Sequence, residues 1–151
     1  MCKKKYLKEA NKATHIRLGV GVILYNEKKL LLELRTDCKQ WGLIGGAVEI
    51  GEGVKNTAIR ECFEETSIKI NKNKLKLLGI YSDISEHRII EYSDNCFHAI
   101  DIVYTYKINE SVKPIKSHES LKLSFFSYDY LPLDLVPPAQ KPINDFIKLL
   151  Q

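Results

Sequence analysis

The segment GGAVEIGEGVKNTAIRECFEETSI, residues 45–68, contains the clearest structural signal in the chain. Residues 54–66 include no glycine or proline, and apolar residues recur among them at helical spacing. The residues expected on the packing side are Ala58, Ile59, Cys62, Phe63 and Thr66. The segment therefore predicts a helix over residues 54–66 that follows a glycine-rich loop.

Three glutamates of this helix, Glu61, Glu64 and Glu65, fall within an arc of roughly 100° when successive residues are about 100° apart. Like charges at this spacing destabilise an exposed helix by about 0.2–0.5 kcal/mol per pair, so they need water or a cation nearby. A solvated acidic surface is the plain interpretation. The functional interpretation is a site for a hard divalent cation such as Mg²⁺, which prefers carboxylate oxygens.

The loop before the helix favours the functional interpretation. Gly45 and Gly46 bring unhindered backbone close to the start of the helix, where a carbonyl oxygen can also reach a cation. Glu52 lies eight residues before Arg60. A Glu52–Arg60 ion pair would fix the loop and orient the carboxylates of the helix.

These residues resemble the signature of the Nudix (MutT-like) hydrolases, which is a glycine, five residues, Glu, seven residues and then Arg-Glu-apolar-x-Glu-Glu-x-Gly-apolar. The matching residues are Gly46, Glu52, Arg60, Glu61, Cys62, Glu64, Glu65 and Ile68, with Trp41-Gly42-Leu43 just upstream. Ser67 stands where glycine is usual, and Ile44 stands where a proline often precedes the two glycines. A left-handed backbone at Ser67 would cost about 1 kcal/mol, but neither departure removes a ligand.

The resemblance implies a pyrophosphohydrolase that cleaves the diphosphate linkage of a small nucleotide-type substrate with Mg²⁺ or Mn²⁺. The substrate would be a nucleoside triphosphate or a nucleotide sugar such as ADP-ribose. A regulatory module on the same fold, which binds a nucleotide without cleaving it, is the alternative. The intact charged residues of the signature favour the enzyme.

The resemblance also implies residue roles. Glu64 and Glu65 would bind the metal with the Gly46 carbonyl, and Glu61 would be a further ligand or the base that activates water. Arg60 and Glu52 would orient these carboxylates. A base outside the signature is the other arrangement in this family, and the candidate here is Glu119.

Candidate substrate contacts lie outside the signature. Arg35 follows a predicted strand and is a candidate for binding a phosphate, with a surface ion pair as the alternative. A nucleobase is expected to stack on an aromatic ring. The aromatic candidates are Trp41, Tyr81, Tyr92 and Phe97, which the sequence does not rank.

The rest of the chain predicts an α+β fold with helices packed on the faces of a mixed sheet. The resemblance implies that this fold is a Nudix-like α/β/α sandwich with the signature helix on the sheet. Strands are predicted at residues 16–25, 30–35, 75–84, 97–108 and 121–128. A turn at residues 26–29 is expected to join the first two strands as a hairpin. A second, amphipathic helix is predicted over residues 137–151, and residues 1–14 are expected to form a polar, helix-permissive arm.

Composition indicates one domain over residues 1–151, with 44% hydrophobic and 28% charged residues. The net charge of +4 comes largely from scattered lysines, so no stable nucleic-acid partner is expected. No apolar run is long enough to span a membrane or to form a signal peptide, and the four cysteines lie far apart. A cytoplasmic protein with reduced thiols is therefore expected. The oligomeric state stays open, a homodimer included.

Overall fold

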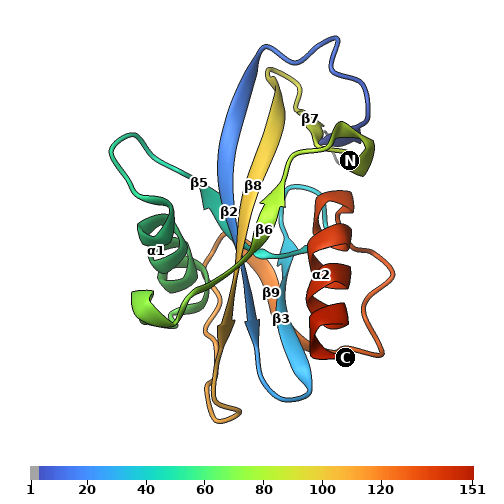
Figure 1. Ribbon diagram of the computed structural model, residues 1–151. Coiled ribbons are helices and arrows are strands. Elements are labelled where there is room, and N and C mark those ends of the chain that lie inside the picture. Colours follow the sequence, from blue (N-terminus) through green and yellow to red (C-terminus); the bar gives the residue numbers. More distant parts are fainter. Residues whose placement is uncertain (1–3) are drawn as a thin grey trace.

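The computed structural model describes residues 4–151, which form one mixed β-sheet with a helix on each face (Figure 1). The strands are β1 Lys5–Leu7, β2 His15–Tyr25, β3 Lys29–Arg35, β4 Trp41–Gly42, β5 Ile44–Ala47, β6 Lys76–Tyr81, β7 Ile89–Glu91, β8 Cys96–Lys107 and β9 Ser120–Ser127. The helices are α1 Val54–Thr66 and α2 Pro137–Leu150, with short 3₁₀ helices η1 Lys72–Lys74 and η2 Ile84–Glu86. The predicted α+β fold, with a mixed sheet that carries the signature helix, is confirmed.

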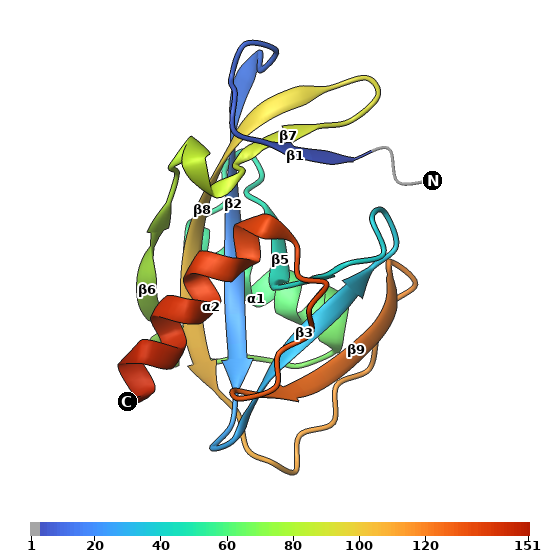
Figure 2. The same ribbon diagram turned by 90° about the vertical axis from the view of Figure 1, so that its right-hand side faces the viewer.

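The parallel pair β2 and β8 forms the centre of the sheet, in register from His15 opposite Phe97 to Tyr25 opposite Lys107. Strand β5 pairs antiparallel with the other edge of β2, and β8 pairs antiparallel with β6 and β7. Strand β3 turns away to pair with β9 and β4. The sheet is therefore strongly curled, and β3 and β9 cross the direction of β2 (Figure 2).

The predicted hairpin between the first two long strands is wrong for most of its length. The turn is present, because Asn26 N–H donates to the Lys29 carbonyl at 2.9 Å. However, β2 pairs with β3 only at Tyr25 opposite Leu30. Beyond that point β5 occupies the edge of β2, from Gly19 to Val22.

Successive residues of the long strands face opposite helices. Leu31 belongs to the apolar cluster beneath α1, which includes Ala58 and Cys62 of that helix. Leu30 and Leu32 belong to the cluster beneath α2, and all three leucines are fully buried. Burying one such side chain contributes about 1.5–3 kcal/mol, so the sheet is stabilised from both faces. This explains the continuous apolar runs in β2 and β3.

The predicted polar, helix-permissive arm is wrong for residues 5–7, which form strand β1. β1 pairs antiparallel with β7, and Tyr6 packs against the cluster beneath α2. Its partner strand is only three residues long and lies far away in the sequence, so neither strand carries a periodic signal. The part of the predicted arm at residues 1–3 lies outside the described residues.

Helix α1 has the predicted bounds, and Ala58, Cys62 and Thr66 are buried as predicted, but the prediction for Phe63 is wrong. Phe63 is 48% exposed, and Lys69 Nζ lies 5.8 Å from the centre of its ring. Glu65 is buried instead, on the same side as Ala58 and Cys62. Ala58, Cys62 and Glu65 are spaced i, i+4 and i+7, and residues at this spacing share one side of a helix. Phe63 directly follows Cys62 and therefore points about 100° away from it. The helix thus turns one of its carboxylates toward the sheet.

Ser67 ends α1 in the left-handed conformation that glycine normally adopts. Its φ is 60° and its ψ is 14°, and its N–H donates to the Phe63 carbonyl at 2.9 Å. The helix therefore ends where a glycine would end it, with a side chain in a conformation that costs about 1–2 kcal/mol.

Ser67→Gly is expected to raise the free energy of unfolding by about 0.5–1 kcal/mol, because the lost strain exceeds the extra entropy of glycine in the unfolded chain. Chemical denaturation with linear extrapolation measures this difference. Ser111→Gly is the matched control, since Ser111 is exposed and is not among the positive-φ residues. A destabilised Ser67→Gly variant would contradict the account of the helix end.

The structure also bears on the expectations about thiols and membranes. Cys38, Cys62 and Cys96 are free and buried, and Cys2 lies outside the described residues. Within residues 4–151, neither helix combines the length and apolar character needed to cross a membrane.

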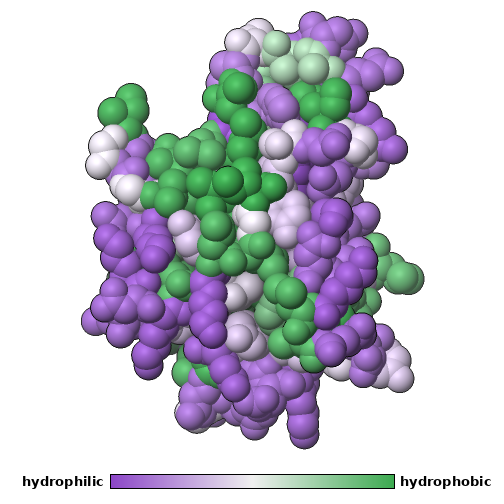
Figure 3. Space-filling model, viewed as in Figure 1, coloured by the Kyte–Doolittle hydropathy of each residue, from purple (hydrophilic) through white to green (hydrophobic). Residues whose placement is uncertain are grey.

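A patch of apolar side chains is exposed on the face shown in Figure 3. It lies over the sheet beside α1. Ile16 and Leu18 of β2 are 64% and 37% exposed, and Ile80 of β6 is 64% exposed. The homodimer that the sequence analysis left open stays a prediction.

Candidate active site

Arg60 of α1 ties the helix to the loop before it. Its Nε donates to Glu52 Oε2 at 2.7 Å and its Nη2 to Glu52 Oε1 at 3.0 Å, so the predicted pair is present. Arg60 Nη2 also donates to the Ala47 carbonyl at 3.1 Å, and Thr57 Oγ1 donates to Glu52 Oε1 at 2.6 Å. These bonds, that of Arg60 first, lower the pKa of Glu52 to about 2. The loop is thereby fixed between β5 and the first turns of α1.

The same guanidinium holds two glutamates of the helix. Arg60 Nη1 donates to Glu61 Oε1 at 2.8 Å and to Glu64 Oε2 at 3.2 Å. The Glu61 side chain is 12% exposed, whereas that of Glu64 is 54% exposed. Burial raises the pKa of Glu61, and Arg60 opposes that rise. Arg60 therefore offsets the repulsion between carboxylates that the sequence places on one side of the helix.

The Glu61 carboxylate lies directly against Gly46 of β5. A Cβ atom at residue 46 would come within 2.3 Å of Glu61 Oε1, so only glycine allows this approach. The preceding Gly45 donates its N–H to Glu65 Oε2 at 3.0 Å. The two glycines therefore bring the backbone of β5 into contact with two carboxylates of α1.

Glu65 meets a carboxylate that the sequence analysis did not consider. Glu33 of β3 is 4% exposed and Glu65 is 5% exposed, and their carboxyl groups lie within hydrogen-bond reach of each other. Burial raises the pKa of both carboxyls, and the charge of Glu33 raises that of Glu65 further. The signal available in the sequence was one acidic residue inside the apolar run LLLELR.

The oxygen atoms at this place suit a hard divalent cation. Within residues 4–151, no three His, Cys, Asp or Glu side chains are arranged to bind a metal ion by themselves. Mg²⁺ needs only one or two carboxylates, because waters and substrate phosphates complete its shell. Glu33 Oε2 is a buried oxygen without a hydrogen-bond partner in the described part of the chain. The donors therefore fit Mg²⁺ or Mn²⁺, and Gly46, Glu61, Glu64 and Glu65 stay the predicted ligands.

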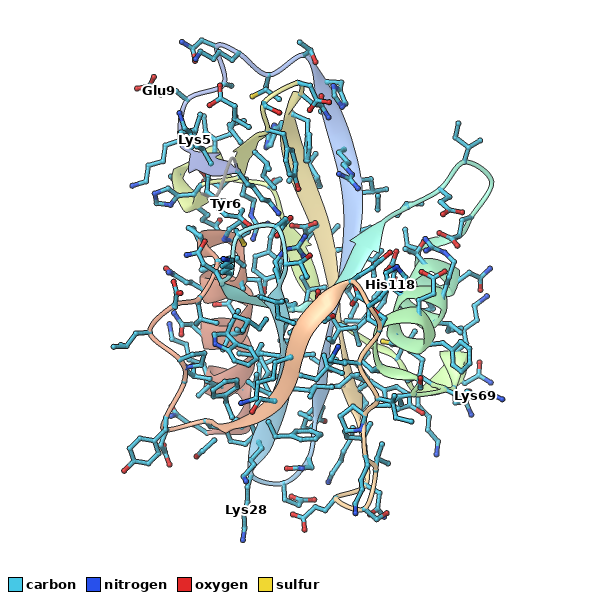
Figure 4. The ribbon with its side chains drawn as sticks, turned by 180° about the vertical axis from the view of Figure 1, so that it is seen from behind. Lys5, Tyr6, Glu9, Lys28, Lys69 and His118 are labelled. Carbon is cyan, nitrogen blue, oxygen red and sulfur yellow. The ribbon has the colours of Figure 1, made fainter. Side chains whose placement is uncertain are left out.

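The turn before β9 brings Glu119 toward the same carboxylates. Its charge acts on Glu61 and raises the pKa of that carboxyl slightly. Glu119 itself is exposed, and its carbonyl accepts a hydrogen bond from Thr36 Oγ1 at 3.0 Å. Its neighbour His118 lies at the start of β9 on the side of α1 (Figure 4). Glu119 is therefore close enough to stay a candidate base.

A pocket of about 200 Å³ lies on the other side of β5, between the sheet and the start of α2. Gly45 and Gly46 line it, and so do Gly19 and Gly21 of β2. Pro138 of α2 lines the opposite wall. The backbone of β5 is thus shared between the pocket and the carboxylates of α1.

Aromatic rings lie at one end of this pocket, and they include two of the four stacking candidates. Tyr92 and Phe97 line it with Tyr6, and the first two rings stack with centroids 6.2 Å apart. Arg17 lies over the Phe97 ring at 5.1 Å. Tyr6, on β1, was missed because its strand was missed.

The other two stacking candidates, Trp41 and Tyr81, do not line the pocket. Trp41 packs edge-on against Phe126 at 4.8 Å. Tyr81 is 7% exposed, and its hydroxyl donates to Asp145 Oδ2 at 3.0 Å. Both rings belong to the packing beneath α2. Their role as substrate contacts stays a prediction.

Asp101 places a carboxylate inside the pocket. Its Oδ2 accepts a hydrogen bond from Arg88 Nη1 at 2.7 Å, and Arg88 is fully buried with its Nη2 bonded to the Pro138 carbonyl. The other oxygen, Oδ1, lies over Gly19, where a Cβ atom would be 2.4 Å away. Burial raises the pKa of Asp101, and Arg88 opposes that rise. The signal in the sequence was one acidic residue within the apolar alternation of β8.

Arg35 lines the pocket and also forms the ion pair given as its alternative. Its Nε and Nη2 donate to Asp37 Oδ1 and Oδ2 at 3.0 and 2.9 Å. Lys4 Nζ contacts the same carboxylate at 3.1 Å. The side chain is about 30% exposed, so the guanidinium can still meet a phosphate at the rim.

Comparison with known proteins places this geometry in a family. The sequence model described as NUDIX domain matches residues 15–148. A Bacillus subtilis protein, provisionally described as an 8-oxo-dGTP diphosphatase, is 30% identical over 129 residues, which cover 85% of this chain and 78% of that protein. An ADP-ribose pyrophosphatase of Methanocaldococcus jannaschii is 32% identical over 150 residues, which cover 97% of this chain and 82% of that protein.

Solved structures show the same fold. The crystal structure of a MutT NUDIX hydrolase from Burkholderia pseudomallei superposes with a TM-score of 0.72 at 24% sequence identity. The match covers 86% of this chain and 97% of that one.

Proposed function

The chain belongs to the Nudix family of hydrolases, and from this premise we propose that it cleaves the diphosphate linkage of a nucleotide with Mg²⁺ or Mn²⁺. The observation that carries the proposal is the position of Gly45 and Gly46. These residues line the pocket and also contact Glu65 and Glu61. A nucleoside in the pocket therefore has its phosphates directed across β5 to the carboxylates.

Different residues have different roles where the phosphates meet the carboxylates of α1. Glu61 is the proton acceptor in this proposal, because its carboxylate lies against Gly46 and is held there by Arg60, beside the predicted ligands Glu64 and Glu65. Glu64 and Glu65, with the Gly46 carbonyl, would hold the cation, and Arg60 and Glu52 keep these carboxylates and the loop in place. When bound, the cation would neutralise phosphate oxygens and lower the pKa of the attacking water.

The pocket favours a guanine-type base. The free oxygen of Asp101 is an acceptor, and guanine presents two adjacent donors, N1–H and the 2-amino group, whereas adenine presents only its amino group. Asp101 pairs with Gly19 of β2, which pairs with Ala47 of β5, so it lies two strand spacings, about 10 Å, from β5. This distance suits a nucleotide whose base contacts Asp101 while its phosphates cross β5. Of the substrates named for the relatives, 8-oxo-dGTP fits this edge better than ADP-ribose.

A panel of substrates tests the proposal. GTP, dGTP, 8-oxo-dGTP, ATP and ADP-ribose are incubated with Mg²⁺ or with EDTA, and phosphorus NMR identifies the products. We expect a nucleoside monophosphate to appear only with the metal, and Glu64→Gln to lower kcat/KM at least about a hundredfold. Glu110→Gln, on an exposed turn, controls for the loss of one charge.

Two results would overturn the proposal. One is that no compound is cleaved at high enzyme concentration with either metal. The other is that Glu64→Gln cleaves as fast as the wild type. Binding of a nucleotide without cleavage would instead support the regulatory module, the alternative drawn from the sequence.

A further inference from the structure

Glu33 is a buried acid that the Nudix signature does not include. Its side chain is 4% exposed, and Oε2 has no hydrogen-bond partner within residues 4–151. Ser120 Oγ, on the adjacent strand β9, is also buried and lies close enough to Glu33 to lower the pKa of its carboxyl. One neutral hydroxyl does not balance a buried negative charge, and a buried charged group that is not fully bonded costs more than about 1–3 kcal/mol, so Glu33 needs an explanation.

In the described part of the chain, the positive side chain nearest in effect to Glu33 is already paired with another carboxylate. Glu65 is a second carboxyl within hydrogen-bond reach, and its Oε2 already accepts the Gly45 N–H. The positive side chain that acts on Glu33 is Arg35, whose Nε and Nη2 are bonded to Asp37. Two carboxyls in contact inside a protein are stable only with a proton or a cation between them.

The position of the Glu33–Glu65 pair favours a cation over a proton as the positive charge between the two carboxyls. Glu65 is a predicted metal ligand, and Gly45 links it to the strand that borders the pocket. Glu33 lies on the same face of β3 as Leu31, which packs beneath α1, and its carboxyl reaches Glu65 of that helix. We propose that Glu33 is an additional carboxylate of the cation site, which supplies an oxygen to the ion directly or through one water. This inference rests on the proposed metal-dependent function.

Binding of Mn²⁺ alone, without substrate, tests the inference. Wild type, Glu33→Gln and Glu9→Gln are titrated with Mn²⁺, and the free ion is followed by electron paramagnetic resonance. Glu9→Gln makes the same change of charge at an exposed residue near β1, at the other end of the molecule (Figure 4). We expect Glu33→Gln to weaken Mn²⁺ binding at least about tenfold, and Glu9→Gln to bind like the wild type.

Thermal unfolding separates metal binding from a purely structural role. In EDTA, Glu33→Gln is expected to melt at the same temperature as the wild type or higher, because one of two facing carboxyls is gone. With Mn²⁺ in excess, the wild type should gain more in melting temperature than Glu33→Gln does. An equal loss of melting temperature in both conditions would overturn the inference, and so would Mn²⁺ affinity within about twofold of the wild type.

A second variant covers the case in which Glu33→Gln does not fold. Glu33→Asp keeps the charge but shortens the side chain, and should bind Mn²⁺ more weakly than the wild type. Unchanged binding by Glu33→Asp would overturn the inference in that case. Cleavage of the nucleotide panel by wild type shows whether the proposed function stands independently of this result.

Discussion

Replacing Gly46 with alanine is expected to lower kcat/KM about a thousandfold, or about 4 kcal/mol in transition-state stabilisation, while the protein stays folded. The added Cβ would lie 2.3 Å from Glu61 Oε1 and 2.5 Å from Glu61 Cδ, so the carboxylate must move away. That movement would break the 2.8 Å bond from Arg60 Nη1 and would take the proposed base away from its present position beside Gly46. Steady-state kinetics on the best substrate of the panel measures the loss.

The fold survives this change because the displaced atoms are the end of a side chain. Gly45 shows the contrast, since a Cβ there would lie 2.0 Å from the Val20 carbonyl and would disturb the pairing of β5 with β2. Gly53→Ala is the matched control, because its Cβ would meet nothing closer than Asn56 Nδ2 at 3.8 Å. If Gly46→Ala kept kcat/KM within about tenfold of the wild type, Glu61 would not need its present position.

The sequence predicted the elements whose signal is local. Helix α1 has the predicted bounds, and the predicted limits of β2, β8 and β9 differ from the observed ones by one residue at most. These segments carry a period of their own, either helical or alternating. Strands β1 and β7 were missed because each is only three residues long, too short for a period of its own, and the partner of β1 lies far away in the sequence. The hairpin of β2 and β3 failed for a related reason, since pairing with β5 competes for the same edge.

The residues of the candidate site also divide into those that the sequence predicted and those that it did not. The spacing of Glu52, Arg60 and the helix glutamates predicted their contacts, because one helix and its loop hold them all. Glu33 and Asp101 were missed because each belongs to another strand and gains its neighbours only when the sheet forms. Both are single acids within apolar strands, a pattern that indicates a buried charge with a partner or a ligand.

Asp101→Asn is expected to change the preference for GTP over XTP about a thousandfold in favour of XTP. Arg88 Nη1 donates to Oδ2 at 2.7 Å, so in the variant the amide oxygen keeps this bond and the amide NH₂ takes the place of Oδ1. The pocket then presents a donor where it presented an acceptor. A donor repels the 2-amino group of guanine and forms a hydrogen bond with the 2-oxo group of xanthine. The loss of binding to GTP and the gain of binding to XTP each contribute roughly 2 kcal/mol to the change in preference.

The ratio of kcat/KM for GTP and XTP measures this exchange, and it needs no wild-type level of activity. Arg88 is fully buried and loses the closer of its two acidic partners, so the variant is expected to melt at a lower temperature. The assays are therefore run well below that temperature. Asp145→Asn is the matched control, because Asp145 binds Tyr81 and Lys141 and does not line the pocket. The wild type alone supplies a second test, since ITP lacks the 2-amino group and should be a poorer substrate than GTP. Equal use of GTP, ITP and XTP by the wild type would show that Asp101 does not contact the base.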